Sequence, residues 1–452
     1  MKEFENTLIN ANPITCEDLA RLEENYSSNQ SHTILRHALS KTALADVVSS
    51  KDDIQDVDFK FSIDIPTMQA TNQKSSGRCW IFAACNVLRE IIGKKANIKE
   101  FEISQSYIAF YDKYEKFNYA LESIIDLIDH DPDERVLSHV LNLGIQDGGQ
   151  WDMFVNIVKK YGICPKNILP ETFASSNTGA MNQFINVQIR KFAATAQKYY
   201  KEVGIEEVKK YKNELLEKMY NFLCDCYGNP VKEFAFEYVD KDNKYHRDEV
   251  FTPNSFFDKF IGSEIDNYVS IIDSPTQDKP YGKTYTIAYL GNVIGGKEIT
   301  HLNLPINRMK ELVISQLKDG EIVWFGSDCG KEGNREDGIW DPNQFDFASA
   351  FGMDFSYSKE DALNYHMSVM NHAMCITGVN LIDDTPTKWK IENSWGTDRA
   401  KAGYYMMSDE WFDKYVYQAV IHKKYLNKKE LKALDGKKII LKPWDPMGSL
   451  AD

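Results

Sequence analysis

Long apolar segments are absent from this sequence of 452 residues. The densest apolar run, WIFAAC at residues 80–85, is far shorter than the roughly 20 residues that a membrane-spanning helix needs. The N-terminal segment MKEFENTLINANPITCEDLA also lacks the apolar stretch of a signal peptide and carries acidic residues early. We therefore expect a soluble, cytoplasmic protein that does not contact a membrane.

Cysteine is sparse as well, with eight residues in the chain, and their spacing has none of the density or regularity of a disulfide framework. We expect all of them to be reduced thiols. Cys224 and Cys226 are separated by a single residue, which is too short for the CxxC of a zinc site, and no second pair or histidine cluster lies nearby. The sequence therefore predicts neither a bound metal nor another cofactor.

Positive charge is in the minority, since 53 Lys and Arg residues face 67 Asp and Glu residues, giving a formal net charge of −14 at pH 7. Such a charge repels nucleic acid and anionic membranes as a whole, which argues against a dedicated polynucleotide binder. The lysine-rich stretch HKKYLNKKELKALDGKK at 422–438 is the exception. It is consistent either with a local nucleic-acid-binding patch or with a solvated helix face.

Apolar residues make up 43% of the chain, enough to build large cores, and the length corresponds to about two or three domain-sized units. From residue 72, a glycine-containing loop leads into a nearly all-apolar helix, which must be buried and which Gly93 is expected to end. A longer helical region follows at 180–225, where apolar residues recur at spacings of three and four. After residue 283, β-branched and aromatic runs separated by turns predict strands.

These patterns predict an α+β protein in which a helical layer is followed by a mostly helical block and then by a β layer. Thr252 is expected to cap a helix that starts at Pro253. The expected segments are a lead-in of short helices and loops at 1–60, a helical layer at 61–165, a mostly helical insertion at 166–282, a β-rich layer at 283–440 and an extended C-terminal arm at 441–452.

Cys79 is the first candidate for chemistry, because it stands where a glycine-containing loop becomes a helix. The N-terminus of a helix carries partial positive charge and free N–H groups, which favour a thiolate and so prepare a nucleophile. Gln73, six residues earlier, is close enough for its amide to join the Cys79 N–H in binding a developing oxyanion. Taken alone, Cys79 would more often be a buried structural cysteine, and Gln73 an ordinary loop residue.

His372 and Asn393 are the candidates for a general base and for the group that orients it. His372 opens the expected strand HAMCITGV, and Asn393 ends the next one, KWKIEN. The turn DDTPT between the two runs predicts an antiparallel hairpin, which brings Asn393 beside His372 to fix its tautomer by a hydrogen bond. Trp395 could then shield that bond from water. Each residue alone would more often be an ordinary core or turn residue.

Gly148 and Gly149, in DGGQWDM, are candidates for binding a peptide substrate. Two glycines would let an extended backbone approach closely enough to form hydrogen bonds as an added strand. As a bare dipeptide, they would signal only a turn.

Together, QKSSGRCWIFA, DGGQWDM, NHAMCITGV and IENSWG resemble the papain-like cysteine peptidases, in which Gln, Cys, His and Asn occur in this order. Ser76 replaces a cysteine that is usually disulfide-bonded in secreted members, which an intracellular enzyme would lose without penalty. His372 follows Cys79 by 293 residues instead of the usual range of about 130–150, so that about 150 residues are inserted. This enlargement and the final segment KPWDPMGSLAD resemble the bleomycin hydrolase and aminopeptidase C branch.

The resemblance implies a cytosolic cysteine aminopeptidase with a papain-like two-layer fold, helical and antiparallel β, that acts on peptides, needs no cofactor and assembles as a homohexamer. It also implies that the C-terminal arm lies in the enzyme's own active-site cleft, where the carboxylate of Asp452 meets the α-ammonium group of the substrate. The thiolate–imidazolium pair of such enzymes implies a raised pKa for His372.

Two alternatives stay open at this point. The first is an endopeptidase with the same chemistry, in which the arm does not restrict the substrate. The second is a nucleic-acid-binding scaffold that has kept a peptidase fold, and its support is the lysine-rich stretch at 422–438.

Overall fold

The computed structural model describes residues 11–50 and 58–451 of the chain. The chain forms two compact units, one made of residues 1–55 with 343–356 and the other of residues 56–342 with 357–452. Within the described ranges, no helix has both the length and the apolar character needed to cross a membrane.

The smaller unit consists of short helices, namely α1 (Cys16–Ser28), α2 (Gln30–Leu39), α3 (Leu44–Val47) and α13 (Phe347–Phe351). Thr15 caps α1 in a reciprocal capping box with Asp18, which supplies partners for two backbone N–H groups. Ser49 pairs with Phe345 in an antiparallel bridge, which joins the two segments of this unit. The short helices predicted near the start of the chain are confirmed.

Helices surround Cys79 in the larger unit. They are α4 (Cys79–Ala96), α5 (Gln105–Asp126), α6 (Arg135–Leu143) and α7 (Trp151–Tyr161). The prediction that α4 is buried is confirmed along most of its length. The expected stop at Gly93 is wrong, because α4 continues to Ala96 and is capped by Asn97, which adopts the left-handed conformation at φ 54°. Gly93 serves packing instead, since a Cβ there would lie 2.4 Å from Cε of Met68.

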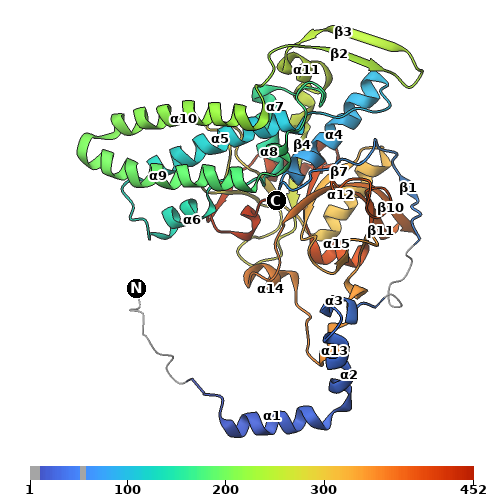
Figure 1. The fold of residues 1–452 in the computed structure, drawn as a ribbon. Helices are drawn as coiled ribbons and strands as arrows, with labels where there is room; N and C mark the ends of the chain where they lie inside the picture. Colours follow the sequence, from blue (N-terminus) through green and yellow to red (C-terminus); the bar gives the residue numbers. More distant parts are fainter. Residues whose placement is uncertain (1–10, 51–57, 452) are drawn as a thin grey trace. The chain divides into compact units, whose positions relative to one another are not determined.

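The helical region predicted at 180–225 is a pair of long helices. After the short α8 (Phe173–Ser176) come α9 (Gly179–Val203) and α10 (Ile205–Tyr227). Gly204, with φ 86°, makes the reversal between the two long helices. Val208, Leu215 and Met219 are buried, so the apolar stripe of α10 does pack against other elements. Figure 1 shows α9 and α10 running alongside α5.

The remainder of the segment 166–282 is less helical than expected. It contains the hairpin of β2 (Phe234–Val239) and β3 (Tyr245–Phe251), then α11 (Pro253–Phe260), the 3-10 helix η1 (Gly262–Asn267) and β4 (Tyr268–Ile272). Thr252 caps α11 as predicted. β4 is a fully buried strand of the main sheet, bonded to β6 and β13, so the β layer already starts at residue 268.

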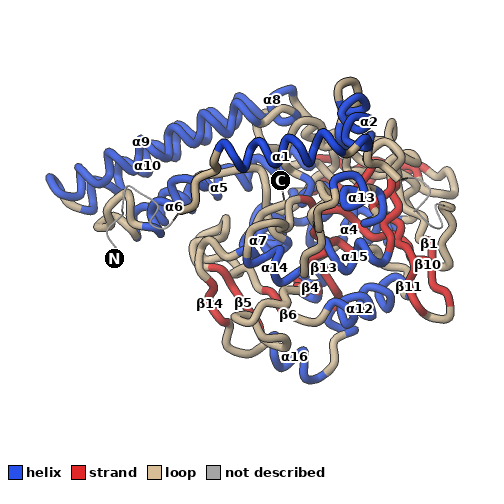
Figure 2. The backbone as a smooth tube through the Cα atoms, turned by 90° about the horizontal axis from the view of Figure 1, so that it is seen from below, coloured by secondary structure: helices blue, strands red, loops and turns tan. Residues whose placement is uncertain are grey.

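A twelve-stranded sheet forms the second layer, in the order β14-β5-β6-β4-β13-β7-β10-β11-β12-β9-β8, with β1 beside β10. Figure 2 shows its strands in red and the helices around them in blue. Its other strands are β1 (Ile63–Asp64), β5 (Thr284–Ile287), β6 (His301–Asn303), β7 (Val323–Ser327), β8 (Gly333–Asn334), β9 (Ile339–Trp340), β10 (His372–Ile382), β11 (Thr385–Glu392), β12 (Tyr404–Ser408), β13 (Val416–His422) and β14 (Ile439–Leu441). The remaining helices are α12 (Ile306–Lys318), η2 (Pro342–Gln344), α14 (Lys359–Asn364), α15 (Asp409–Tyr415), η3 (Lys423–Tyr425), α16 (Lys428–Leu434) and η4 (Pro446–Gly448).

The expected antiparallel layer is found throughout the centre of the sheet, whereas parallel pairs occur toward its edges. β13, β7, β10, β11 and β12 run antiparallel to their neighbours in this series. The pairs β4–β6, β5–β14 and β9–β12 are parallel, so the sheet is mixed. The central antiparallel strands are the ones that carry the candidate site.

Alternation along β10 divides its side chains between two cores. Ala373 and Cys375 belong to the core that includes α4, whereas Met374 and Ile376 belong to the core that includes α12 and α15. Because α4 lies directly against β10, the helical layer and the sheet meet where Cys79 begins α4 and His372 begins β10.

Candidate active site

Cys79 is the first residue of α4 and is fully buried at the seam between α4 and β10. The backbone N–H of Ala373 in β10 donates to its Sγ atom over 3.3 Å. The helix N-terminus and this N–H group both stabilise negative charge on the sulfur, which is what a nucleophilic cysteine requires. In the part of the chain that the structure describes, all eight cysteines are reduced.

His372 is the first residue of β10, directly before the N–H group that reaches Cys79. Its Nε2 lies 2.9 Å from Oδ1 of Asn393, which follows β11. β10 and β11 form the predicted hairpin, which turns at Asp383 and Asp384, both with positive φ. The hairpin therefore brings the imidazole and the carboxamide together although they are 21 positions apart.

The contacts of Asn393 determine which ring nitrogen of His372 carries the proton. Because Oδ1 of Asn393 also accepts the N–H of Ser394 (2.8 Å), it acts as an acceptor toward Nε2 of His372. Nδ1 is then the nitrogen that can exchange a proton with Cys79. Burial lowers the pKa of His372 to about 4, while the hydrogen bond to Asn393 acts in the opposite direction. The buried imidazole is therefore neutral at pH 7 in this state, and the raised pKa expected for the thiolate–imidazolium pair stays a prediction.

Trp395 lies against this imidazole, with 5.0 Å between the ring centroids. On the indole of Trp395, the guanidinium of Arg335 lies 5.0 Å from the ring centroid. The indole of Trp395 therefore lies beside the imidazole of His372, as it must if it shields the hydrogen bond between His372 and Asn393 from water.

Gln73 has its amide held at both ends. Nε2 donates to the carbonyl of Ser76 (2.5 Å), and Oε1 accepts from the hydroxyl of Ser394 (2.6 Å). The first contact ties the amide to the loop before Cys79, and the second ties it to the residue after Asn393. Gln73 and His372 line one cavity of about 620 Å³, and the second proton on Nε2 is available for an oxyanion there.

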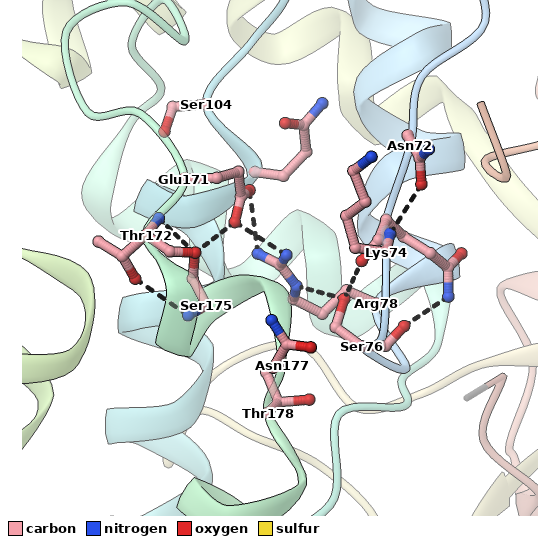
Figure 3. Close-up of polar contacts among 12 residues, drawn as sticks. Asn72, Lys74, Ser76, Arg78, Ser104, Glu171, Thr172, Ser175, Asn177 and Thr178 are labelled. Atoms are coloured by element: carbon pink, nitrogen blue, oxygen red, sulfur yellow. Dashed lines mark hydrogen bonds and ion pairs between the residues drawn. The ribbon is translucent and has the colours of Figure 1, made fainter. Parts of the chain in front are cut away.

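A buried ion pair braces the loop that leads to Cys79 (Figure 3). Arg78 donates through both terminal nitrogens to the carboxylate of Glu171 (3.1 and 2.9 Å). Nε of Arg78 donates to the hydroxyl of Ser76 (2.9 Å). The hydroxyl of Ser175, in α8, donates to the carboxylate of Glu171. Because Arg78 is 1% exposed, this bidentate pair is shielded from water and fixes the loop to the residues around α8.

A second buried carboxylate, Asp147, joins the same loop to the glycine pair. Its Oδ2 accepts the N–H of Gly77 (2.9 Å), and its Oδ1 pairs with the ammonium of Lys113. Asp147 directly precedes Gly148 and Gly149. Asp147 therefore links the loop before Cys79 to the glycine pair. Sequence reasoning found neither this residue nor the Arg78 pair.

The C-terminal arm occupies the place expected for an added substrate strand. The N–H of Gly149 donates to the carbonyl of Ala451 (3.2 Å) in an antiparallel bridge. Beside it, Nε2 of Gln150 donates to the carbonyl of Ser449 (2.6 Å). Asp452, the residue expected to meet the substrate's α-ammonium group, lies outside the described residues.

Both glycines permit close approaches that no other residue would. A Cβ at Gly148 would lie 2.7 Å from the carbonyl oxygen of Ala451, and one at Gly149 would lie 2.5 Å from the ring of Trp80. Gly148 therefore lets the arm approach, whereas Gly149 lets this segment lie against Trp80.

Several contacts hold the arm along its length. The guanidinium of Arg135 lies 3.8 Å from the ring centroid of Trp444, and Asp445 pairs with the buried ammonium of Lys279 (3.0 Å). Leu450 lines a mostly apolar cavity of about 40 Å³. The arm is extended as predicted, apart from the single 3-10 turn η4, and it packs as part of the larger unit.

The family model described as "Peptidase C1-like family" matches residues 13–448 of the chain. The chain belongs to this family. Aminopeptidase C of Lactobacillus delbrueckii subsp. lactis is 45% identical over 442 residues, which cover 97% of this chain and 98% of that protein. Bleomycin hydrolase of Homo sapiens is 36% identical over 450 residues, covering 97% and 99%. The crystal structure of PepW from Lactobacillus rhamnosis HN001 matches with a TM-score of 0.95 at 43% identity, covering 97% of this chain and 99% of that one.

Membership in the Peptidase C1-like family confirms the papain-like fold and the bleomycin hydrolase and aminopeptidase C branch that the four motifs predicted. The predicted enzyme class, a cysteine-type aminopeptidase, is also confirmed, because relatives named Aminopeptidase C match over nearly the whole chain.

Proposed function

We propose that Cys79, His372 and Asn393 remove N-terminal residues from peptides by acyl-enzyme chemistry. The thiol of Cys79 gives its proton to Nδ1 of His372, and the sulfur attacks the carbonyl carbon of the first substrate residue. Nε2 of Gln73 and the N–H of Cys79 bind the resulting oxyanion. His372 then protonates the leaving amine, after which water, with the same imidazole as base, hydrolyses the thioester.

The pairing of Gly149 with Ala451 is the observation that carries the aminopeptidase mode. A strand of the protein itself lies where substrate residues ahead of the scissile bond would otherwise bind. Only one substrate residue then fits between the arm and Cys79. In this proposal the carboxylate of Asp452, the residue after Ala451, pairs with the substrate's α-ammonium group.

Matched peptides with free and acetylated N-termini test this mode. We expect release of single residues from the free peptides only, and a loss of at least about 1000-fold in kcat for Cys79→Ala. Cys16→Ala, at an exposed cysteine of the smaller unit, is the matched control and should keep full activity. Cleavage of acetylated peptides at a comparable rate would instead identify an endopeptidase.

The contacts of the lysine-rich stretch do not favour the nucleic-acid-binding alternative. Lys424 pairs with Glu321 (2.7 Å) and Asp319 (3.2 Å), and Lys438 pairs with Glu298 (3.1 Å). Acidic neighbours thus neutralise part of this charge, as on an ordinary solvated surface.

We also propose, from the family resemblance, that the protein works in the cytoplasm as a homohexamer. The human relative's name makes bleomycin-like amides candidate substrates. Sedimentation equilibrium of the purified protein tests the assembly, and a stable monomer at micromolar concentration would contradict it.

A further inference from the structure

A polar cleft of about 620 Å³ lies beside His372 and Gln73. No described residue of the C-terminal arm lines it, since the arm contacts Gly149 and Gln150 instead. The surroundings of Cys79 therefore have two parts, one covered by the arm and one that the arm leaves open.

Three cations line this cleft against one carboxylate. Lys74, Arg335 and Arg399 are exposed there, and Asp398 is the carboxylate. Asp398 is the single carboxylate among the described residues that line the cleft, so the lining carries a net positive charge. The chain as a whole carries a formal charge of −14, so this positive lining stands out against an acidic protein.

The positions of the arm and of His372 determine which part of a bound peptide enters the cleft. If the arm holds the substrate's N-terminus near Gly149, the chain must continue past Cys79 toward His372, which protonates the leaving amine. His372 itself lines the cleft, so the second and third substrate residues lie among Lys74, Arg335 and Arg399.

We propose that this cleft binds a carboxylate in the leaving part of the peptide, through Arg399, Lys74 and Arg335. The inference rests on the proposed aminopeptidase function, because that function sets the direction of the substrate. The carboxylate comes either from the C-terminus of a dipeptide or tripeptide or from an Asp or Glu side chain soon after the scissile bond. Guanidinium groups suit such a ligand because they can donate two parallel hydrogen bonds to one carboxylate.

Binding to the Cys79→Ala protein tests the proposal without turnover. One pair of ligands is Ala-Ala-Ala and its C-terminal amide, and the second is Ala-Glu-Ala amide and Ala-Gln-Ala amide. Calorimetry should show each charged peptide binding about 3- to 10-fold more tightly than its neutral partner, with the ratio falling toward one at about 0.5 M salt. The first pair reports a terminal carboxylate, and the second reports a side chain.

Substitutions in the same background assign the effect to the cleft. Arg399→Gln and Lys74→Gln should each lower the charged-to-neutral ratio by about twofold or more. Lys198→Gln, at an exposed position of α9, is the matched control and should leave the ratio unchanged. Arg335 is less suitable, because it lies over Trp395 beside His372.

Equal binding of charged and neutral peptides in both pairs would overturn the proposal, whatever the turnover. A preference in one pair supports it and identifies the source of the carboxylate. Failure of the proposed function has a different signature, since wild-type protein would then release no alanine from any of these peptides while the binding ratio persisted.

Discussion

Arg78 directly precedes Cys79, and its guanidinium donates two hydrogen bonds to the carboxylate of Glu171 (Figure 3). The side chain of Glu171 is 17% exposed, but Arg78 is 1% exposed, so loss of Glu171 leaves a buried guanidinium without its partner. We therefore expect Glu171→Met to cost about 3–5 kcal/mol of unfolding free energy. The double variant Arg78→Met/Glu171→Met should recover much of this loss. Denaturant unfolding measures the stability, and the rate of Cys79 alkylation reports whether the loop has shifted.

An exposed pair on the β2–β3 hairpin provides the control for this cycle. Arg247 and Glu237 lie 3.2 Å apart with both side chains largely in water, and their removal should cost about 0–1 kcal/mol. A cost for Glu171→Met within that small range would show that the buried pair does not brace the loop.

The candidate catalytic residues could be predicted from sequence because each lies in a short motif whose neighbouring residues indicate the local structure. Cys79 follows a glycine-containing loop, and His372 opens an apolar strand. Arg78, Glu171 and Asp147 could not be predicted in the same way. Arg78 and Glu171 are 93 positions apart, and a charged residue carries no sign of burial until its partner is known.

At the scale of elements, periodicity and turn chemistry predicted the long helices and the β10–β11 hairpin, where local signals agree with the final fold. The strand β4 escaped prediction because it is only five residues long and lies directly after helical segments. β1, β8 and β9 have two residues each, and their pairing depends on partners elsewhere in the chain.

The arm is the element whose removal should change specificity most. Deleting residues 449–452 removes the bridge to Gly149 and the hydrogen bond from Gln150. We expect weaker turnover of peptides with free N-termini and new cleavage of N-blocked peptides, measured as kcat/KM for both. Trp444→Ala loosens the arm at Arg135 but keeps its end, and its effect should be intermediate. A truncated enzyme that still rejects blocked peptides would show that the arm is not the gate.

At the scale of the whole molecule, the candidate site depends on the packing of two layers. Cys79 comes from the helical layer, whereas His372 and Asn393 come from a hairpin of the sheet. The contact between Ala373 and Cys79 crosses that seam. Conditions that loosen the seam should therefore abolish activity before either layer unfolds, because the proton transfer needs both layers in register.

Acid should destabilise the larger unit through His301, a buried residue of β6 outside the candidate site. The imidazole is 1% exposed, its Nδ1 lies 2.7 Å from the hydroxyl of Ser270, and within the described residues its Nε2 has no hydrogen-bond partner. Burial lowers the pKa of His301 from 6.5 to about 3, with the nearby charge of Lys297 acting in the same direction. The folded state therefore resists a proton that the unfolded state accepts.

Because the pKa of His301 is lower in the folded state than in the unfolded state, acid should lower the stability of the fold. Above pH 6.5 the imidazole of His301 does not change the free energy of unfolding. Below pH 6.5 it should lower that free energy by about 1.4 kcal/mol per pH unit until the pH approaches 3. Glutamine at this position cannot take up a proton, so the stability of the wild type relative to His301→Gln should fall by about 3 kcal/mol between pH 7.5 and pH 4.5. Urea denaturation at both pH values gives this difference.

Other titrating groups cancel in that comparison. Burial lowers the pKa of His372 to about 4 and raises that of Glu392 to about 7, but both residues are the same in the two proteins. Asn213→Gln, at an exposed position of α10 with no titrating side chain, is the control and should change stability equally at both pH values. If the gap between wild type and His301→Gln were also constant with pH, a buried neutral imidazole at this position would be ruled out.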